Sequence, residues 1–174
     1  MPMSNSFIDE LQSNIDHWTT IMDAMVNRGV SPAQLRGIPT EQLELLYRDG
    51  LNLLSTAQFL QAKQSLSVLC SLEWNDARYW VALGVALQNL REYHRAILAY
   101  CRASLIEEDP RTAMRVAECW LRVGDVEECR TALNQVIEWA DDDDAGRCLS
   151  AAAKEMLTKL PDPNPSKTSP SAGN

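Results

Sequence analysis

Histidine, cysteine and clustered carboxylates are the side chains of this chain that could do chemistry. There are 2 histidines, His17 and His94, and neither stands at metal-ligand spacing from a cysteine or a carboxylate. The 5 cysteines include no Cys-x-x-Cys pair. The motifs of phosphate-binding loops, dinucleotide folds, zinc proteases and serine hydrolases are also missing. We therefore expect no catalytic residues, no metal site and no cofactor, and a protein that is not an enzyme.

The cysteines are expected to be reduced thiols in or near a core. Most lie among apolar residues at helical spacing, where free cysteine behaves as a small hydrophobic residue. Their odd number argues against a complete disulfide framework and favours a reducing compartment. They are Cys70, Cys101, Cys119, Cys129 and Cys148.

A run of four aspartates, 141–144, invites a calcium site. It lacks the alternating ligand spacing, the central glycine and the closing glutamate of a calcium loop. We expect a solvated turn instead, with Asp144 as the N-cap of a last helix that ends near Leu160. His94 is likewise expected to be an exposed turn residue. Two pairs of neighbouring glutamates beside turns are interpreted as solvated: Glu107–Glu108 and Glu127–Glu128.

Composition indicates a cytoplasmic globular protein with protein partners. The chain has 174 residues, of which 45% are hydrophobic and 23% charged, so one domain with a core is expected. Its net charge of −8 makes nucleic acid and anionic membranes poor partners. No apolar run approaches membrane-spanning length, and the start, MPMSNSFIDELQ, lacks the basic and apolar regions of a signal peptide. A basic or apolar segment of another protein is the partner that we expect.

The segment 77–110 carries the strongest structural pattern. Gly84 leaves room on a first helix for a second helix to approach closely, and Ala96 is its small partner on that second helix. This spacing matches the 34-residue helix–turn–helix pattern of the tetratricopeptide repeat, or TPR. Other residues at helical spacing complete the two packing faces: Trp80, Leu83, Leu87, Tyr100 and Ala103.

One such hairpin cannot bury its apolar face alone, so further repeats are expected on both sides. Gly50 and Ala62 each stand 34 residues before Gly84 and Ala96, and Cys129 follows Ala96 by 33. The sequence therefore predicts an all-α, TPR-type helical-hairpin solenoid. Its three repeats are expected over 43–76, 77–109 and 110–143.

The rest of the chain is expected to flank these repeats. An amphipathic helix in an N-terminal arm, 1–36, is predicted to cap the first repeat or to serve as a dimerisation or docking arm. The repeats and a C-terminal capping helix would occupy 37–160. The Pro- and Ser-rich segment 161–174 is expected to be a disordered tail.

Two features depart from the repeat pattern in the first repeat. Asp49 aligns with the apolar Leu83, and because a buried acid is costly unless paired, we expect Asp49 to tilt outward or to meet a basic neighbour. The turn 55–57 has no Gly or Asn for a left-handed helix end, whereas the later repeats offer Asn89 and Gly124.

The first helix of each TPR hairpin lines the concave face of the solenoid, so these helices should supply a binding groove. Several of its positions are apolar although they lie off the core stripe, which suits an extended peptide with apolar anchors. A groove filled by the terminal helix or the tail is the alternative. The expected groove residues are Glu44, Tyr47, Leu51, Leu54, Arg78, Val81, Val85, Gln88, Arg111, Met114, Glu118 and Leu121.

A groove that clamps a C-terminal carboxylate, as in co-chaperones of heat-shock proteins, needs lysines and asparagines on these inner faces. Tyr47, Leu51 and Ala82 stand at such positions here. That class of TPR protein is therefore disfavoured.

Sequence motifs that are more specific than the general TPR pattern occur between residues 36 and 140. They are Leu69-Cys70-x-Leu72, followed by Asp76-Ala77-Arg78-Tyr79, and Ala117-Glu118-Cys119-x-Leu121-x-x-Gly124-Asp125. In these motifs and their order the chain resembles the class II chaperones of bacterial type III secretion, the LcrH/SycD family of TPR translocator chaperones.

The resemblance implies a cytoplasmic chaperone that holds hydrophobic translocators before export and binds an extended N-terminal segment of them in its groove. It also implies a homodimer through the N-terminal region and, for some members, a transcriptional regulator as partner. Tyr47 matches the family's groove tyrosine, whereas Leu51 and Leu54 stand where aromatic residues are frequent, which implies a less aromatic pocket. The alternative is a TPR scaffold subunit with a constitutive partner in another secretion or pilus assembly.

Overall fold

The computed structural model describes residues 16–17, 19–140 and 143–161, and these form helices, turns and loops without a strand. Most of the expected N-terminal helix and nearly all of the expected tail lie outside the described residues. A helical segment over 19–26 comes first. It is followed by α2 (Pro32–Leu35), α3 (Thr40–Ser55), α4 (Phe59–Leu72), α5 (Ala77–Asn89), α6 (Tyr93–Ser104), α7 (Pro110–Val123), α8 (Val126–Trp139) and α9 (Asp144–Lys159).

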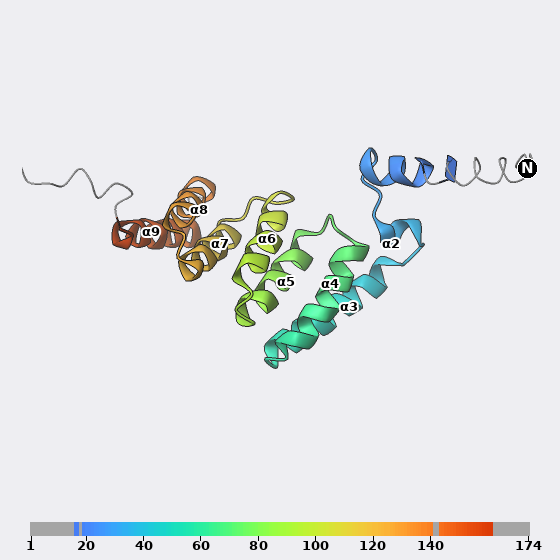
Figure 1. The fold of residues 1–174 in the computed structure, drawn as a ribbon, viewed down its shortest axis with the longest axis horizontal. Helices are drawn as coiled ribbons and strands as arrows, with labels where there is room; N and C mark the ends of the chain where they lie inside the picture. Colours follow the sequence, from blue (N-terminus) through green and yellow to red (C-terminus); the bar gives the residue numbers. More distant parts are fainter. Residues whose placement is uncertain (1–15, 18, 141–142, 162–174) are drawn as a thin grey trace, which may run out of the picture.

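Three helical hairpins, α3–α4, α5–α6 and α7–α8, follow one another along the long axis of the molecule (Figure 1). Helix α2 lies toward one end of this row and α9 toward the other. The second helix of each hairpin packs on the next helix of the chain, and the first helices also touch, α3 with α5 and α7 with α9. This arrangement is the all-α, TPR-type solenoid that the sequence predicts.

Aspartate side chains begin four of the helices. Asp76, Asp109, Asp125 and Asp143 each accept a hydrogen bond from a backbone N–H in the first turn of the helix that follows. Asp143 accepts from the N–H of Gly146 at 2.6 Å. The prediction that Asp144 caps this last helix is therefore wrong by one residue.

The turns inside the hairpins each contain one residue in the left-handed backbone region. These are Ala57, Arg91 and Gly124, with φ of 58°, 60° and 91°. Asn89 was the residue predicted for the second turn, but it still belongs to α5. A side chain in this conformation costs roughly 1–2 kcal/mol, which only the glycine avoids.

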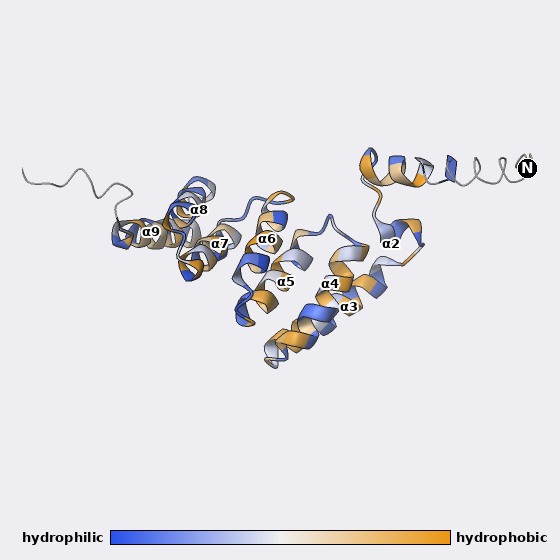
Figure 2. Cartoon of the chain, in the orientation of Figure 1, coloured by the Kyte–Doolittle hydropathy of each residue, from blue (hydrophilic) through white to orange (hydrophobic). Residues whose placement is uncertain are grey.

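A continuous core of small and aliphatic side chains runs through the hairpins. Figure 2 shows hydrophobic and hydrophilic residues interspersed along the hairpin helices. Ala62, Ala96 and Cys129 stand at equivalent places of the three hairpins and are fully buried. Asp49 is exposed, which is the outward tilt expected for an acid at a core position. The hydrophobic effect at this core supplies the force that stacks the hairpins.

All five cysteines are free thiols. Cys70, Cys119 and Cys129 are buried, whereas Cys101 and Cys148 are exposed. Burial raises the pKa of the Cys70 thiol to about 12 and that of Cys119 to about 11, so these two thiols stay protonated at neutral pH.

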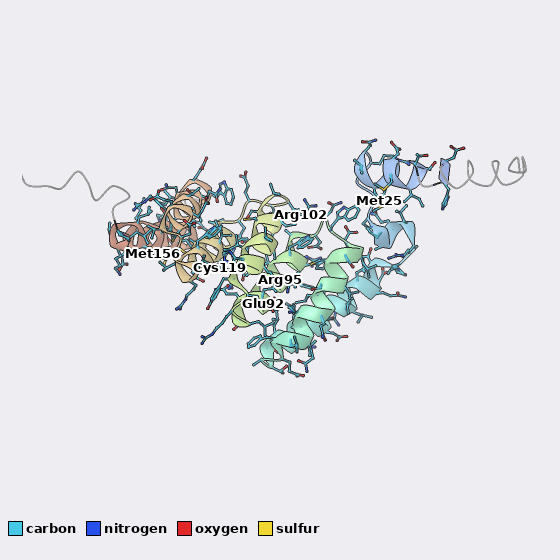
Figure 3. The ribbon with its side chains drawn as sticks, viewed as in Figure 1. Met25, Glu92, Arg95, Arg102, Cys119 and Met156 are labelled. Carbon is cyan, nitrogen blue, oxygen red and sulfur yellow. The ribbon has the colours of Figure 1, made fainter. Side chains whose placement is uncertain are left out.

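An ion-pair cluster links the first two hairpins on the side of their second helices. Lys63 Nζ on α4 lies 2.8 Å from Glu92 Oε1, and Arg95 Nη1 lies 2.6 Å from Glu92 Oε2. These hydrogen bonds, chiefly that of Lys63, lower the pKa of Glu92. Figure 3 shows Glu92 and Arg95 at the start of α6 and Arg102 at its far end.

None of the helices in the described part of the chain combines the length and the apolar character that crossing a membrane requires.

Candidate peptide-binding groove

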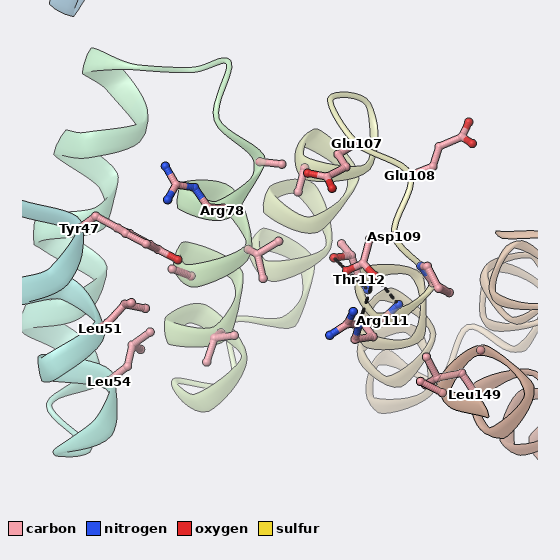
Figure 4. Close-up of a pocket in the computed structure, with 18 of the residues that line it drawn as sticks. Tyr47, Leu51, Leu54, Arg78, Glu107, Glu108, Asp109, Arg111, Thr112 and Leu149 are labelled. Atoms are coloured by element: carbon pink, nitrogen blue, oxygen red, sulfur yellow. Dashed lines mark hydrogen bonds and ion pairs between the residues drawn. The ribbon is translucent and has the colours of Figure 1, made fainter. Parts of the chain in front are cut away.

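A cavity of about 560 Å³ opens on the face made by the first helices of the hairpins and by α9 (Figure 4). Apolar side chains of α3 form one wall, and α5 lies across from them. The loop after α6, the start of α7 and the start of α9 complete the lining. The lining residues include Tyr47, Leu51, Leu54, Arg78, Val81, Val85, Glu107, Glu108, Asp109, Arg111, Thr112, Asp143, Gly146 and Leu149.

Helical periodicity brings the apolar lining together. Leu51 follows Tyr47 by four residues on α3, and Val85 follows Val81 by four on α5, so each pair shares one face of its helix. Tyr47, Val81 and Val85 are half-buried and pack against the core, whereas Leu51 is 40% exposed. The cavity wall is thus an outer layer of the core that remains open to solvent.

Six of the expected groove residues, all on α3 and α5, line this cavity: Tyr47, Leu51, Leu54, Arg78, Val81 and Val85. Arg111, a further expected groove residue, also lines the cavity. Glu44 does not line it, but its carboxylate forms an ion pair with the lining residue Arg78. The other four lie outside its lining, on the C-terminal part of α5 and along α7: Gln88, Met114, Glu118 and Leu121. That any of these residues contacts a peptide stays a prediction.

Arg78 organises the wall between α3 and α5. Its guanidinium lies 2.6 Å from Glu44 Oε1 and 2.6 Å from Asp76 Oδ2. It also lies 5.4 Å from the centre of the Tyr47 ring and 5.5 Å from that of Tyr79, within the range of cation–π contacts. Hydrogen bonds from Asp76 and Glu44 raise the pKa of Arg78, which is therefore always charged. Its charge is already compensated by two carboxylates, so Arg78 positions Tyr47 rather than offering a free cation.

Two tyrosines stand side by side at this wall. The rings of Tyr47 and Tyr79 are 5.0 Å apart and tilted by 47°. The Tyr79 hydroxyl donates a hydrogen bond to Glu44 Oε1 at 3.2 Å. Burial is the main cause that raises the pKa of both phenols, so both are neutral at physiological pH and present apolar ring surface to the cavity or the core.

Acidic residues gather at one end of the cavity, where sequence reasoning expected only solvated turns. Glu107, Glu108, Asp109 and Asp143 all line it. Asp109 lies 3.6 Å from Arg111, whereas Glu107 and Glu108 form no ion pair with the described residues. The cavity therefore pairs an apolar wall with a negative end. Periodicity could not reveal this end, because loop residues follow no helical period.

The C-terminal helix lines the cavity, whereas the alternative considered from the sequence was that this helix or the tail fills the groove. Gly146 and Leu149 of α9 line it, but the helix forms a wall and does not fill the space. Leu149 is half-buried against the core. Gly146 is buried in the first turn of α9, a helix that packs against α7 and α8.

The described residues contain no group of three or more histidine, cysteine or carboxylate side chains placed to hold a metal ion. The chemistry that the cavity offers is therefore that of its apolar wall and its carboxylates. Such a surface binds by burial of apolar groups and by charge complementarity.

Known proteins are similar to this chain in sequence and fold. The low calcium response locus protein H of Yersinia pestis is 28% identical over 140 residues, which are 80% of this chain and 83% of that protein. PcrH from Pseudomonas aeruginosa is 32% identical, with a TM-score of 0.65 over 73% of this chain and 97% of PcrH. SycD, a type III secretion chaperone of Yersinia enterocolitica, was solved with a peptide of the translocator YopD. It is 27% identical, with a TM-score of 0.66 over 70% of this chain and 94% of SycD.

No model of a protein family matches the chain. The similarity to PcrH nevertheless extends over nearly all of PcrH, and it concerns both sequence and three-dimensional arrangement. The cavity is lined by residues of α3, α5 and α7, the first helices of the three repeated hairpins. The chain belongs to the LcrH/SycD/PcrH family of type III secretion translocator chaperones.

Proposed function

We propose that this protein is a cytoplasmic chaperone that binds hydrophobic translocators of a type III secretion system and keeps them competent for export. The observation that carries the proposal is the open cavity with an apolar wall on the inner helices of the solenoid. SycD, whose fold this chain shares, binds a translocator peptide. An extended N-terminal segment of the client is the proposed ligand.

The mechanism is sequestration of apolar side chains. Tyr47, Leu51, Leu54, Val81 and Val85 would contact anchors of the client. Each fully buried anchor of leucine size contributes roughly 1.5–3 kcal/mol. About three anchors are enough for micromolar or tighter binding after the costs of association are met. The acidic body keeps the complex dispersed, and the acidic end of the cavity favours a client segment with a basic flank.

Self-association through the N-terminal arm, 1–36, is part of the proposal. Its support in the described residues is a set of exposed apolar side chains: Met22 and Val26 are 53% and 71% exposed, and Leu35 is 42% exposed. Asn75 Nδ2 donates to Gly29 O at 3.1 Å and ties the end of this arm to the solenoid. A transcriptional regulator as a further partner rests on the resemblance alone.

Affinity capture tests the proposed client. Tagged protein would be expressed in its native host, and co-purifying proteins would be identified by mass. We expect a protein with long apolar membrane segments, and we expect its loss when the cavity wall carries Tyr47→Ala, Val81→Ser and Val85→Ser together. The matched control carries changes of the same kind at exposed positions outside the cavity: Leu60→Ser, Val68→Ser and Leu98→Ala.

Circular dichroism must show both variants folded. Equal loss of the client from the cavity variant and the control would exclude the cavity as its binding site. Recovery of only non-exported, non-membrane partners would favour the alternative function, a scaffold subunit in another secretion or pilus assembly.

A further inference from the structure

A second, smaller cavity of about 300 Å³ lies at the other end of α5 and α7. Its lining is almost entirely polar and includes three arginines. We call it the arginine pocket, and it consists of Gln88, Asn89, Arg91, Tyr93, Arg115 and Arg122.

The charge of this pocket is not compensated within the described structure. Arg91, Arg115 and Arg122 form no ion pair with any carboxylate of the described residues, whereas Arg78, Arg95 and others do. Arg115 lies close enough to Tyr100 to interact with its phenol, and Arg122 stands in the last turn of α7. Three cations in one small pocket are unexpected on a chain whose net charge is −8.

Hydrogen bonds hold the two amide side chains of the pocket, Gln88 and Asn89. The Tyr100 hydroxyl donates to Gln88 Oε1 at 2.8 Å, and Gln88 Nε2 donates to Glu118 Oε2 at 3.2 Å. Glu118 is thus a carboxylate beside the pocket, and it accepts from Gln88 but forms no ion pair with the arginines of the pocket. Asn89 Nδ2 donates to the carbonyl of Val85 at 2.8 Å.

The arginine pocket continues the face that forms the large cavity. On α5, Val81 and Val85 line the cavity and Gln88 lines the pocket, at spacings of four and three residues. On α7, Arg111 lines the cavity and Arg115 lines the pocket, four residues further on. Three residues of helix rise about 4.5 Å, little more than one residue of an extended peptide. A segment anchored in the cavity therefore reaches the pocket within a few residues.

We propose that the arginine pocket binds carboxylate side chains of the client segment next to its apolar anchors. This inference rests on the proposed function. Guanidinium groups bind carboxylates in pairs of parallel hydrogen bonds, so three of them suit an acidic side chain or two neighbouring ones. With Glu107 and Glu108 at the opposite end, just before the start of α7 (Figure 4), the groove is charged at both ends with opposite sign. The client would then lie in one direction, its basic flank at the acidic end and its acidic flank at the pocket.

Two triple variants of equal charge test the pocket with the captured client. The pocket variant carries Arg91→Gln, Arg115→Gln and Arg122→Gln. The control carries the same change at arginines outside both cavities that form no ion pair with the described residues: Arg36→Gln, Arg48→Gln and Arg102→Gln. Arg102 serves well because it stands in a last helical turn, as Arg122 does, at the far end of α6 (Figure 3).

We expect the pocket variant to bind the client about tenfold more weakly at low salt, with the difference shrinking as salt screens the charges. The control should stay within twofold of the unmodified protein. Equal affinity of the pocket variant and the control would overturn the inference. If the cavity variant loses the client and the pocket variant keeps it, the proposed function stands and the inference alone fails.

A probe that needs no client tests the same site. Capped tetraglutamate and capped tetraglutamine would be added at millimolar concentration to the ¹⁵N-labelled full chain. We expect tetraglutamate alone to shift the side-chain amide signals of Gln88 and Asn89, and the pocket variant to abolish the shift. Unshifted signals, or equal shifts with tetraglutamine, would overturn the assignment of a carboxylate site.

Discussion

At the scale of single residues, Gly84 and Tyr100 make a notably close contact between α5 and α6. A Cβ atom placed on Gly84 would lie 2.4 Å from Cε1 and 2.6 Å from Cδ1 of Tyr100. Tyr100 is fully buried, and its hydroxyl donates to Gln88, so a shift of the ring would disturb packed neighbours and this hydrogen bond. Glycine is needed here for close packing of two helices, not for a turn conformation.

The substitution Gly84→Ala should therefore lower stability although alanine favours helix by about 1 kcal/mol. Overpacking of a filled core costs roughly 1–3 kcal/mol, and we expect a net loss in the free energy of unfolding. Urea unfolding followed by circular dichroism would measure it. Gly50→Ala is the matched control with a smaller expected loss, because its Cβ would meet the more flexible Leu66 side chain at 2.7 Å. A Gly84→Ala protein as stable as the original would contradict this account.

Residue types and spacing could predict the apolar part of the groove but not its charged ends. Tyr47, Leu51 and Val85 could be predicted as lining residues, because the helical period assigns each residue to one face of its helix. Glu107 and Asp143 reach the cavity only because of the path that the loops take between stacked hairpins. Likewise, the gathering of Arg91 with Arg115 depends on how α7 packs beside the α5–α6 turn, which no local pattern encodes.

At the scale of helices, α7 begins with an unusually complete N-cap. Asp109 accepts from the N–H groups of Arg111 and Thr112 at 3.1 and 3.2 Å. The Thr112 hydroxyl also donates to Asp109 Oδ2 at 2.8 Å, and Thr112 is only 2% exposed. One carboxylate thus satisfies three donors, one of them buried, at the helix start that borders the cavity.

Asp109→Ala should destabilise the protein by about 1–2 kcal/mol, since the cap is lost and the Thr112 hydroxyl is left without its acceptor. Asp109→Asn keeps one of the two acceptor oxygens, enough for the N–H and hydroxyl of Thr112, so its loss of stability should be clearly smaller. Thermal and urea unfolding of both variants would measure the difference. Equal losses would show that the charge of Asp109, and not its capping oxygen, stabilises the start of α7.

Helix identity was easier to predict than helix ends. The two helices expected within 77–109 are α5 and α6, because the spacing around Gly84 and Ala96 is that of two packed helices. The start of α9 was misplaced because neighbouring aspartates are equally competent caps, and only the backbone path selects Asp143. The left-handed residue Arg91 was missed because the repeat geometry, which places it 34 residues after Ala57, overrides the residue preference.

At the scale of the whole molecule, the hairpins are unevenly buried. Helix α5 lies between neighbours on both sides and buries six of its residues, whereas α3 buries only Leu43 and Gly50. Two leucines of α3 remain exposed, Leu45 at 56% and Leu51 at 40%. Since stability in a repeat protein is the sum of each hairpin and its interfaces, the first hairpin should be the weaker part of the solenoid.

Hydrogen exchange followed by mass spectrometry would test this gradient. We expect amides of α3 to exchange faster than those of α5 and α6, because local opening of an end hairpin breaks fewer buried contacts than opening of a central one. The proposed client would add apolar contacts to the cavity residues Tyr47, Leu51 and Leu54, so its binding should slow exchange in α3 most. The same client should leave α3 unprotected in the variant with Tyr47→Ala, Val81→Ser and Val85→Ser. Uniform exchange from α3 to α8 would contradict this account. It would mean that the solenoid opens as one cooperative unit, so that client binding has no separately opening α3 to stabilise.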